Sequence, residues 1–181
     1  MIGFLRWHMR NKRNITTKDI VLIGVMLATI EAVKVSLSAI PGVELVTLLV
    51  MLYALVFRRN IYYALAAFIL LEGCLYGFGV WWFMYVYIWP LLAFLTQRLA
   101  KNNSVIIWSI FAAIYGLMFG ALCSIPYLII GGPKMAFAWW IAGIPTDITH
   151  CISNFVVCLI LFNPLKIILN KVNEQFYTNK Y

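Results

Sequence analysis

Four of the six acidic residues in this 181-residue chain lie within or beside strongly apolar stretches. They are Glu31, Glu44, Glu72 and Asp147. Hydrocarbon penalises charge, so such residues in a membrane protein normally face its interior or a water-filled cavity. These carboxylates are therefore the best indication in the sequence of a site that handles a polar solute.

Three polar residues, Asp147, His150 and Asn154, form a stripe on the helix predicted over 135–162. Intervals of three and four residues place them on one helix face, and Asp147 lies roughly 18 Å from the outer end at 1.5 Å per residue. We call this set the polar stripe. It favours a functional cavity, and hydrogen bonding between two helices is the alternative. Asp147 and His150 lack a third ligand at suitable spacing, so no metal site is expected.

Aromatic residues near two predicted helix ends could clamp a planar ring or a cation. Trp81 and Trp82 suit an aromatic belt at the membrane interface, whereas Tyr85 and Trp89 continue the aromatic face inward. The predicted aromatic wall comprises Trp81, Trp82, Tyr85, Trp89, Tyr127, Trp139 and Trp140.

The remaining charged residues of the apolar stretches have two interpretations each. Glu44 begins a predicted helix, where a carboxylate either stabilises the helix dipole or contacts a solute. Glu31 and Lys34 are three residues apart, so a structural pair between them is expected, and the alternative is that they reach the cavity near the outer half of their helix. Glu72 is a candidate partner for Lys34 or His150.

The composition excludes an ordinary soluble domain. Hydrophobic residues make up 64% of the chain, charged residues 11%, and the mean hydropathy is +0.92, whereas soluble domains carry about 25% charged residues. At roughly 20 residues per span, the length allows about six membrane helices. The four cysteines lie in apolar segments without a CxxC pair, so neither a disulfide scaffold nor a zinc site is expected.

The apolar runs predict an all-α integral membrane protein, a bundle of six transmembrane helices. The predicted spans are 18–39, 43–57, 61–78, 82–99, 105–130 and 135–162, with Thr17 as the first cap, Asn163-Pro164 as the last stop and a short polar helix over 165–176. The predicted regions are a basic arm, 1–17, a substrate-binding domain, 18–169, and a polar tail, 170–181.

The distribution of cations predicts the orientation. Of the 14 Lys and Arg residues, twelve fall in the predicted inner segments, Lys134 in an outer loop and Lys34 inside the first helix. Positive charge accumulates on the cytoplasmic side, so both termini are predicted to be cytoplasmic. Because the cations lie at helix ends, membrane lipid is an expected partner and nucleic acid is not.

A small-residue face, Gly24, Ala28 and Ala32, runs along the first predicted helix at intervals of four. Such faces let a second helix approach closely in lipid. The spacing leaves open whether that helix belongs to this chain or to a separate membrane partner.

These features together resemble a substrate-binding S component of an energy-coupling factor transporter. The resemblance covers about residues 18–169 and is carried by six short helices, basic cytoplasmic ends and the alanine pair in Ala28-Thr29-Ile30-Glu31-Ala32. Glu31 departs from the family pattern, where an apolar residue is more usual within that docking motif.

The resemblance implies a multi-pass protein of the bacterial plasma membrane that captures a vitamin or related micronutrient in an outward-facing cavity. It further implies docking, through Gly24, Ala28 and Ala32, on a transmembrane coupling protein with two ATPase subunits, which use the ATP; the chain itself is expected to need no cofactor. The implied ligand contacts are Glu44, Trp81, Trp82, Tyr85, Trp89, Tyr127, Trp139, Trp140, Asp147, His150 and Asn154.

Within the expected cavity, acidic groups outnumber basic ones, and together with the aromatic residues this favours a heteroaromatic ligand with a donor or a positive charge, similar to pyridoxine or a thiamine precursor. The chain contains no G-x-x-x-x-G-K-[ST], H-E-x-x-H or G-x-S-x-G motif, so catalysis is not expected. The alternatives are a small integral membrane enzyme using Asp147, His150 and Glu72, or a membrane assembly subunit with an empty cavity.

Overall fold

The computed structural model describes residues 15–40 and 43–178, and every regular element in these ranges is an α-helix. The helices are α2 (Thr17–Leu37), α3 (Val46–Val56), α4 (Asn60–Tyr76), α5 (Val80–Arg98), α6 (Val105–Leu117), α7 (Phe119–Cys123) and α8 (Ile125–Thr178). The predicted all-α class is therefore confirmed for this part of the chain. Most of the predicted basic arm, residues 1–14, lies outside the described residues.

Helix α2 begins with a reciprocal cap between Thr16 and Asp19. The Thr16 hydroxyl accepts a hydrogen bond from the Asp19 backbone N–H at 3.3 Å, and the Asp19 carboxylate accepts one from the Thr16 N–H at 2.9 Å. The predicted cap at Thr17 is wrong by one residue, because only Thr16 has an acidic residue three positions later to complete the pair.

Three of the helices in the described ranges are long and apolar enough to cross a membrane. They are α2, α5 and the run Ile125–Tyr177 of α8. The shorter α3 has 11 residues, so it rises only about 16 Å against a hydrocarbon core of about 30 Å. Nearly all of its side chains are buried, and it contacts α2, α4, α5 and α8, which makes α3 the centre of the core.

The predicted end of the last span at Asn163-Pro164 is wrong, because α8 continues through Pro164 to Thr178. Proline removes one helical hydrogen bond, but apolar side chains beyond it still pack on the core. These are Leu165, Leu169, Val172 and Phe176. The predicted break near Gly131-Gly132-Pro133 does occur: Gly132 adopts φ 75°, a conformation that favours glycine.

The predicted helix 105–130 is divided into α6, α7 and the first turns of α8. The division after α6 coincides with a tertiary hydrogen bond, since the Gly120 N–H donates to Asp147 Oδ1 at 2.9 Å. The Asp147 carboxylate of α8 thus caps the start of α7. A polar group on one helix therefore bonds to the backbone of its neighbour at the point where that neighbour is interrupted.

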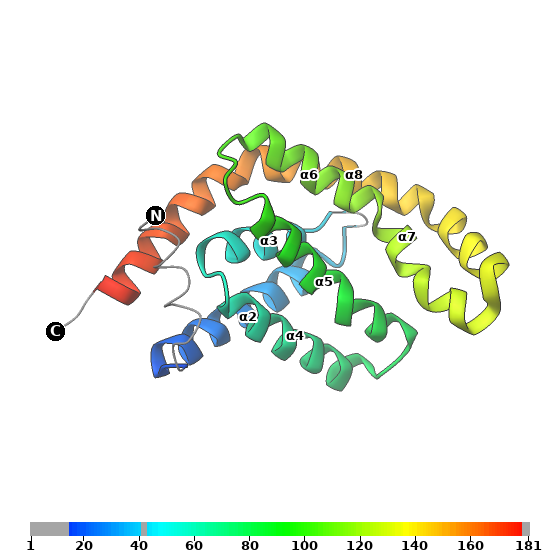
Figure 1. Ribbon diagram of the computed structural model, residues 1–181, viewed down its shortest axis with the longest axis horizontal. Coiled ribbons are helices and arrows are strands. Elements are labelled where there is room, and N and C mark those ends of the chain that lie inside the picture. Colours follow the sequence, from blue (N-terminus) through cyan, green and yellow to red (C-terminus); the bar gives the residue numbers. More distant parts are fainter. Residues whose placement is uncertain (1–14, 41–42, 179–181) are drawn as a thin grey trace.

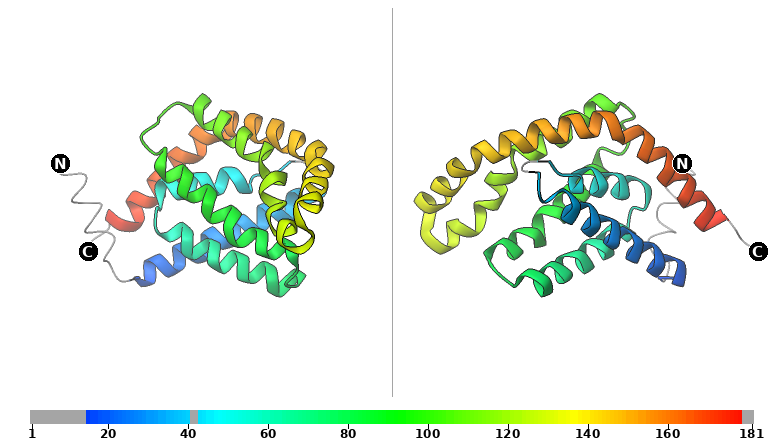
Figure 2. Two further views of the ribbon diagram at one scale, coloured as in Figure 1. Left: turned by 45° about the vertical axis from the view of Figure 1, so that its right-hand side comes forward. Right: turned by 180° about the vertical axis from the view of Figure 1, so that it is seen from behind.

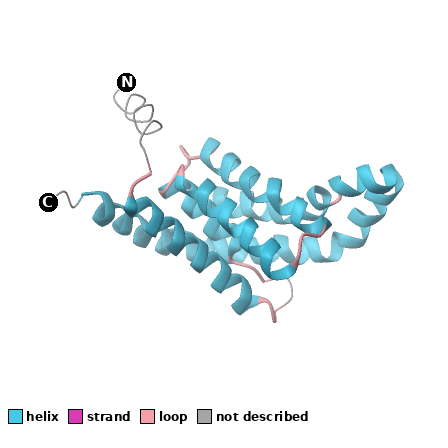
Figure 3. Ribbon diagram, turned by 90° about the horizontal axis from the view of Figure 1, so that it is seen from below, coloured by secondary structure: helices cyan, strands magenta, loops and turns pink. Residues whose placement is uncertain are grey.

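The helices form a bundle with one projecting hairpin (Figure 1). Helix α2 packs on α4, α4 on α5, and α6 on α8. The long α8 arches across the other helices and brings its C-terminal turns close to the start of α2 (Figure 2). Helix α7 and the first part of α8 extend beyond the bundle (Figure 3). The space enclosed by α2, α4 and α5 is where the candidate site lies.

Candidate functional site

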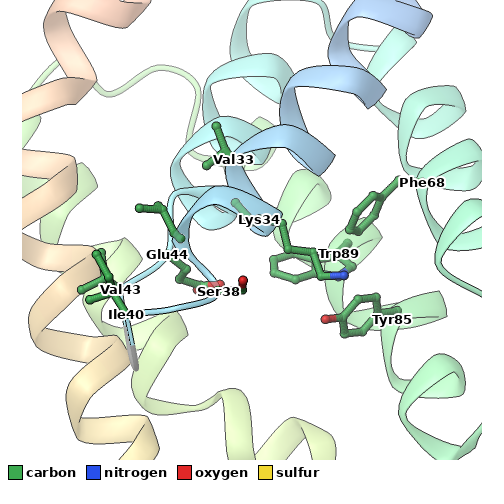
Figure 4. Close-up of a pocket in the computed structure, with 11 residues that line it drawn as sticks. Val33, Lys34, Ser38, Ile40, Val43, Glu44, Phe68, Tyr85 and Trp89 are labelled. Carbon is green, nitrogen blue, oxygen red and sulfur yellow. The ribbon is translucent and has the colours of Figure 1, made fainter. Parts of the chain in front are cut away.

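A cavity of about 280 Å³ lies between helices α2, α4 and α5 and the segment that connects α2 to α3. Its polar and aromatic lining comprises Lys34, Ser38, Glu44, Phe68, Tyr85 and Trp89. Figure 4 shows Glu44 and Ser38 on one side, and Phe68 and Tyr85 on the other, with Lys34 descending from α2. The cavity therefore has a polar side made by the end of α2 and the start of α3, and an aromatic side made by α4 and α5.

The position of Glu44 is compatible with both of the roles that the sequence left open. It lies two residues before α3, where the helix dipole favours a carboxylate, and it also lines the cavity. Its Oε1 accepts hydrogen bonds from the Thr47 hydroxyl at 2.8 Å and from Asn154 Nδ2 at 3.4 Å. The carboxylate is thus held by one donor from α3 and one from α8.

Tyr85 and Trp89 are the two members of the predicted aromatic wall that line the cavity. They lie one turn apart on α5, and their rings meet edge to face with centroids 5.6 Å apart. Phe68 of α4 stacks on Tyr85 at 6.1 Å. Sequence analysis missed Phe68, although it lies one turn before Glu72, and that i, i+4 relationship to a buried carboxylate was a usable signal.

The ion pair of Lys34 joins α2 to α4 rather than forming within α2. Lys34 forms an ion pair with Glu72, as one alternative predicted, and its ammonium lies 4.5 Å from the centre of the Tyr76 ring. The expected ion pair between Glu31 and Lys34 is not formed in the described structure. Instead the Glu31 carboxyl group lies beside Glu72. Two carboxyl groups therefore lie near one lysine beside the cavity, and Glu72 is the one that pairs with it.

The polar stripe of α8 packs against α6 and α7. Asp147 is 3% exposed and Asn154 is 2% exposed. A Cβ atom placed on Gly120 would lie 2.3 Å from Asp147 Oδ2, and one on Gly116 would lie 2.8 Å from Asn154 Nδ2. Only glycine permits so close an approach. Asp147 thus forms a hydrogen bond between two helices, which was the alternative to a functional cavity. Asn154 contacts Glu44, which lines the cavity.

His150, the third member of the polar stripe, is partly buried beside Phe119, with ring centroids 5.7 Å apart. Neither Asp147 nor His150 lines the cavity described above. Both leave one polar side-chain atom buried without a hydrogen-bond partner among the described residues, Asp147 Oδ2 and His150 Nδ1. The structure therefore separates these two residues from Glu44, Tyr85 and Trp89.

The other predicted aromatic residues lie outside the cavity. Trp81 meets the ring of Tyr85, a lining residue, edge to face at 5.5 Å. Trp82 donates its indole N–H to the Ile69 carbonyl at 2.8 Å and thereby joins α5 to α4. In the projecting hairpin, Tyr127 stacks on Trp139 at 4.1 Å, and Trp140 is exposed.

The small-residue face of α2 points away from the rest of the chain. Gly24, Ala28 and Ala32 are all exposed, and a Cβ atom on Gly24 would meet nothing within 4 Å. The opposite face of α2 carries the buried residues Leu22, Met26, and Ile30. Packing within the described chain therefore does not account for this face.

Comparisons with protein-family models, with curated proteins and with solved structures find no match for this chain.

Proposed function

We propose that this chain is the substrate-capture subunit of an energy-coupling factor importer in a bacterial plasma membrane. The observation that carries the proposal is the cavity itself, a polar and aromatic hollow inside an apolar helical bundle. Polar side chains within membrane helices are costly unless they serve a site or an ion pathway. Lys34, within α2, lines this cavity, and Glu44 lines it from the connection just before α3.

The dimensions of the cavity indicate a small ligand. Small-molecule sites usually measure about 300–1,000 Å³, and the cavity, at about 280 Å³, lies just below that range. A single ring with short substituents suits this volume better than a larger vitamin with several rings. This supports a vitamin or related micronutrient similar to pyridoxine or a thiamine precursor.

The exposed small-residue face supports a separate membrane partner. Ala28 and Ala32 lie on the side of α2 opposite its buried core, and small residues permit close helix contacts in lipid. In the proposed assembly this face contacts a transmembrane coupling protein that carries two ATPase subunits. Helix α2 also contributes Lys34 and Ser38 to the cavity, so one helix serves both the ligand and the partner.

The proposed topology has six membrane crossings and cytoplasmic termini. It rests on the unequal distribution of Lys and Arg between the two sides. In this topology the short α3 is accommodated because it is enclosed by longer neighbours. The ligand is then captured from the side where the connection between α2 and α3 lies.

Affinity purification and uptake measurements test the proposal together. The tagged chain should recover a membrane protein and two ATPases, and cells should accumulate the ligand only with active ATPases. The variant Ala28→Trp should lose both the partners and uptake while it retains ligand binding. Ile160→Trp, at another exposed position, 62% accessible on α8, should keep all three properties. Turnover of a compound by the isolated chain would instead favour an enzyme.

A further inference from the structure

The charges around the cavity do not balance. The Lys34 ammonium is neutralised by Glu72, whose side chain is 1% exposed. Among the described residues, Glu44 receives hydrogen bonds from the neutral donors Thr47 and Asn154. Within residues 15–40 and 43–178, no Lys, Arg or His forms an ion pair with Glu44. The polar side of the cavity therefore carries an uncompensated negative charge.

Aromatic rings face that charge across the cavity. Figure 4 shows the Tyr85 hydroxyl pointing into the space toward the side on which Glu44 and Ser38 lie. Phe68 and Trp89 complete the aromatic side. The faces of aromatic rings attract cations, and the attraction between opposite charges strengthens away from bulk water. Both sides of the cavity therefore favour the same ligand charge.

We infer that the cavity selects a planar aromatic ligand that carries a positive charge, and that Glu44 contacts the cationic group. This inference rests on the proposed function, because it names the class of substrate that the capture subunit takes. The ring packs among Phe68, Tyr85 and Trp89, and its ammonium or protonated nitrogen donates to the Glu44 carboxylate. An anionic vitamin of similar size would meet an unpaired carboxylate and is excluded.

Asn154 is a positioning residue for Glu44. Its amide nitrogen contacts Glu44 Oε1, and its side chain is itself fixed by close packing against Gly116. Asn154 is not among the residues that line the cavity. It therefore acts on the ligand only through the orientation of the Glu44 carboxylate, and it links α8 to the ligand site.

Two series of charge-matched compounds test this inference on the full-length chain in lipid nanodiscs. Pyridoxamine, pyridoxine and 4-pyridoxate carry a cationic, neutral or anionic group on the same ring, and benzylamine, benzyl alcohol and benzoate repeat the comparison on a simpler ring. Calorimetry should rank the cation first in both series. A hydrogen bond to a charged group predicts a preference of about tenfold to a hundredfold over the neutral compound.

Substitutions then assign that preference to its residues. Glu44→Gln keeps the shape of the side chain and should reduce the cation preference to about onefold, whereas Glu174→Gln removes an exposed carboxylate of α8 and should leave it unchanged. Asn154→Ala should weaken binding of the cations and leave binding of the neutral compounds within about twofold. A merely structural role for Asn154 would weaken all the compounds equally. Thermal unfolding of each variant shows whether it is folded.

Preference for the anions, or no binding in either series, would overturn the inference. An unchanged cation preference in folded Glu44→Gln would also overturn it. The proposed function fails separately, when the wild-type chain recovers no membrane partner and supports no uptake. The two failures are thus distinguishable.

Discussion

The Asn154 amide donates a hydrogen bond to the Glu44 carboxylate across 110 positions of sequence, with 3.4 Å between nitrogen and oxygen. This contact joins the long α8 to a residue on the polar side of the cavity. Through Gly116, Asn154 is also packed against α6. The geometry of the cavity therefore depends on helices that do not line it.

Close packing of α7 on α8 should depend on Gly120. In Gly120→Ala, the new Cβ would lie 2.3 Å from Asp147 Oδ2, and overpacking of this kind costs about 1–3 kcal/mol. The melting temperature in detergent should fall. Gly24→Ala is the matched control, because a Cβ there meets nothing within 4 Å. Equal melting temperatures for both variants would show that α7 does not pack on Asp147 as described.

The ion pair between Lys34 and Glu72 should be a stability element. Lys34→Met would leave Glu72, 1% exposed, without its cation and beside Glu31. Removing one partner of a buried pair costs about 3–5 kcal/mol, and we expect about 3 kcal/mol because the Lys34 side chain is 27% exposed.

Adding Glu72→Gln to Lys34→Met should recover much of that loss, because the double variant removes both charges of the ion pair and relieves Glu31 of a neighbouring carboxylate. Lys101→Met, at an exposed turn, is the control for loss of a lysine. Chemical unfolding in detergent measures the series. If the double variant is less stable than Lys34→Met alone, the pairing is not what stabilises this region.

Asp19 should hold three chain segments together at the end of the bundle opposite Glu44. Its carboxylate accepts hydrogen bonds from Thr16, Asn60 and Tyr177, which belong to the beginnings of α2 and α4 and the end of α8. Asp19→Ala should cost about 2–3 kcal/mol. Hydrogen exchange should rise in the last turns of α8, and Glu174→Ala should not raise it. Unchanged exchange in those turns would contradict this role.

Sequence analysis predicted the helical class and singled out three of the residues that line the cavity, and the differences have physical causes. The break at Gly132 was predictable because a glycine pair next to proline rarely continues a helix. The continuation of α8 through Pro164 was not, because it depends on the packing of Leu165 and Leu169 against distant residues. Local sequence preference thus predicted the break at Gly132, which tertiary packing does not oppose. It failed at Pro164, where tertiary packing keeps the helix continuous.

The site shows the same limit. Spacing placed Asp147 and Asn154 on one face of α8, but spacing alone does not say which neighbour each residue meets. Asp147 meets the α7 backbone, and Asn154 meets Glu44. Lys34 had candidate partners at Glu31 and Glu72, and only the packing of α2 on α4 selects Glu72. Glu44, Tyr85 and Trp89 could be singled out because a charged residue or an aromatic run in an apolar segment is recognisable without knowledge of its neighbours in the fold.

The central claim, that the cavity holds a small molecule, is tested most directly by mass spectrometry of compounds retained on the purified chain. Wild-type protein should retain one small ring compound in equimolar amount. Ser38→Trp, which fills the cavity from its polar side, should retain none, and Ala39→Trp, on the next exposed residue outside the lining, should retain it like wild type. Retention of the same compound in folded Ser38→Trp, or no compound on wild-type protein that has been exposed to growth medium, would contradict the account.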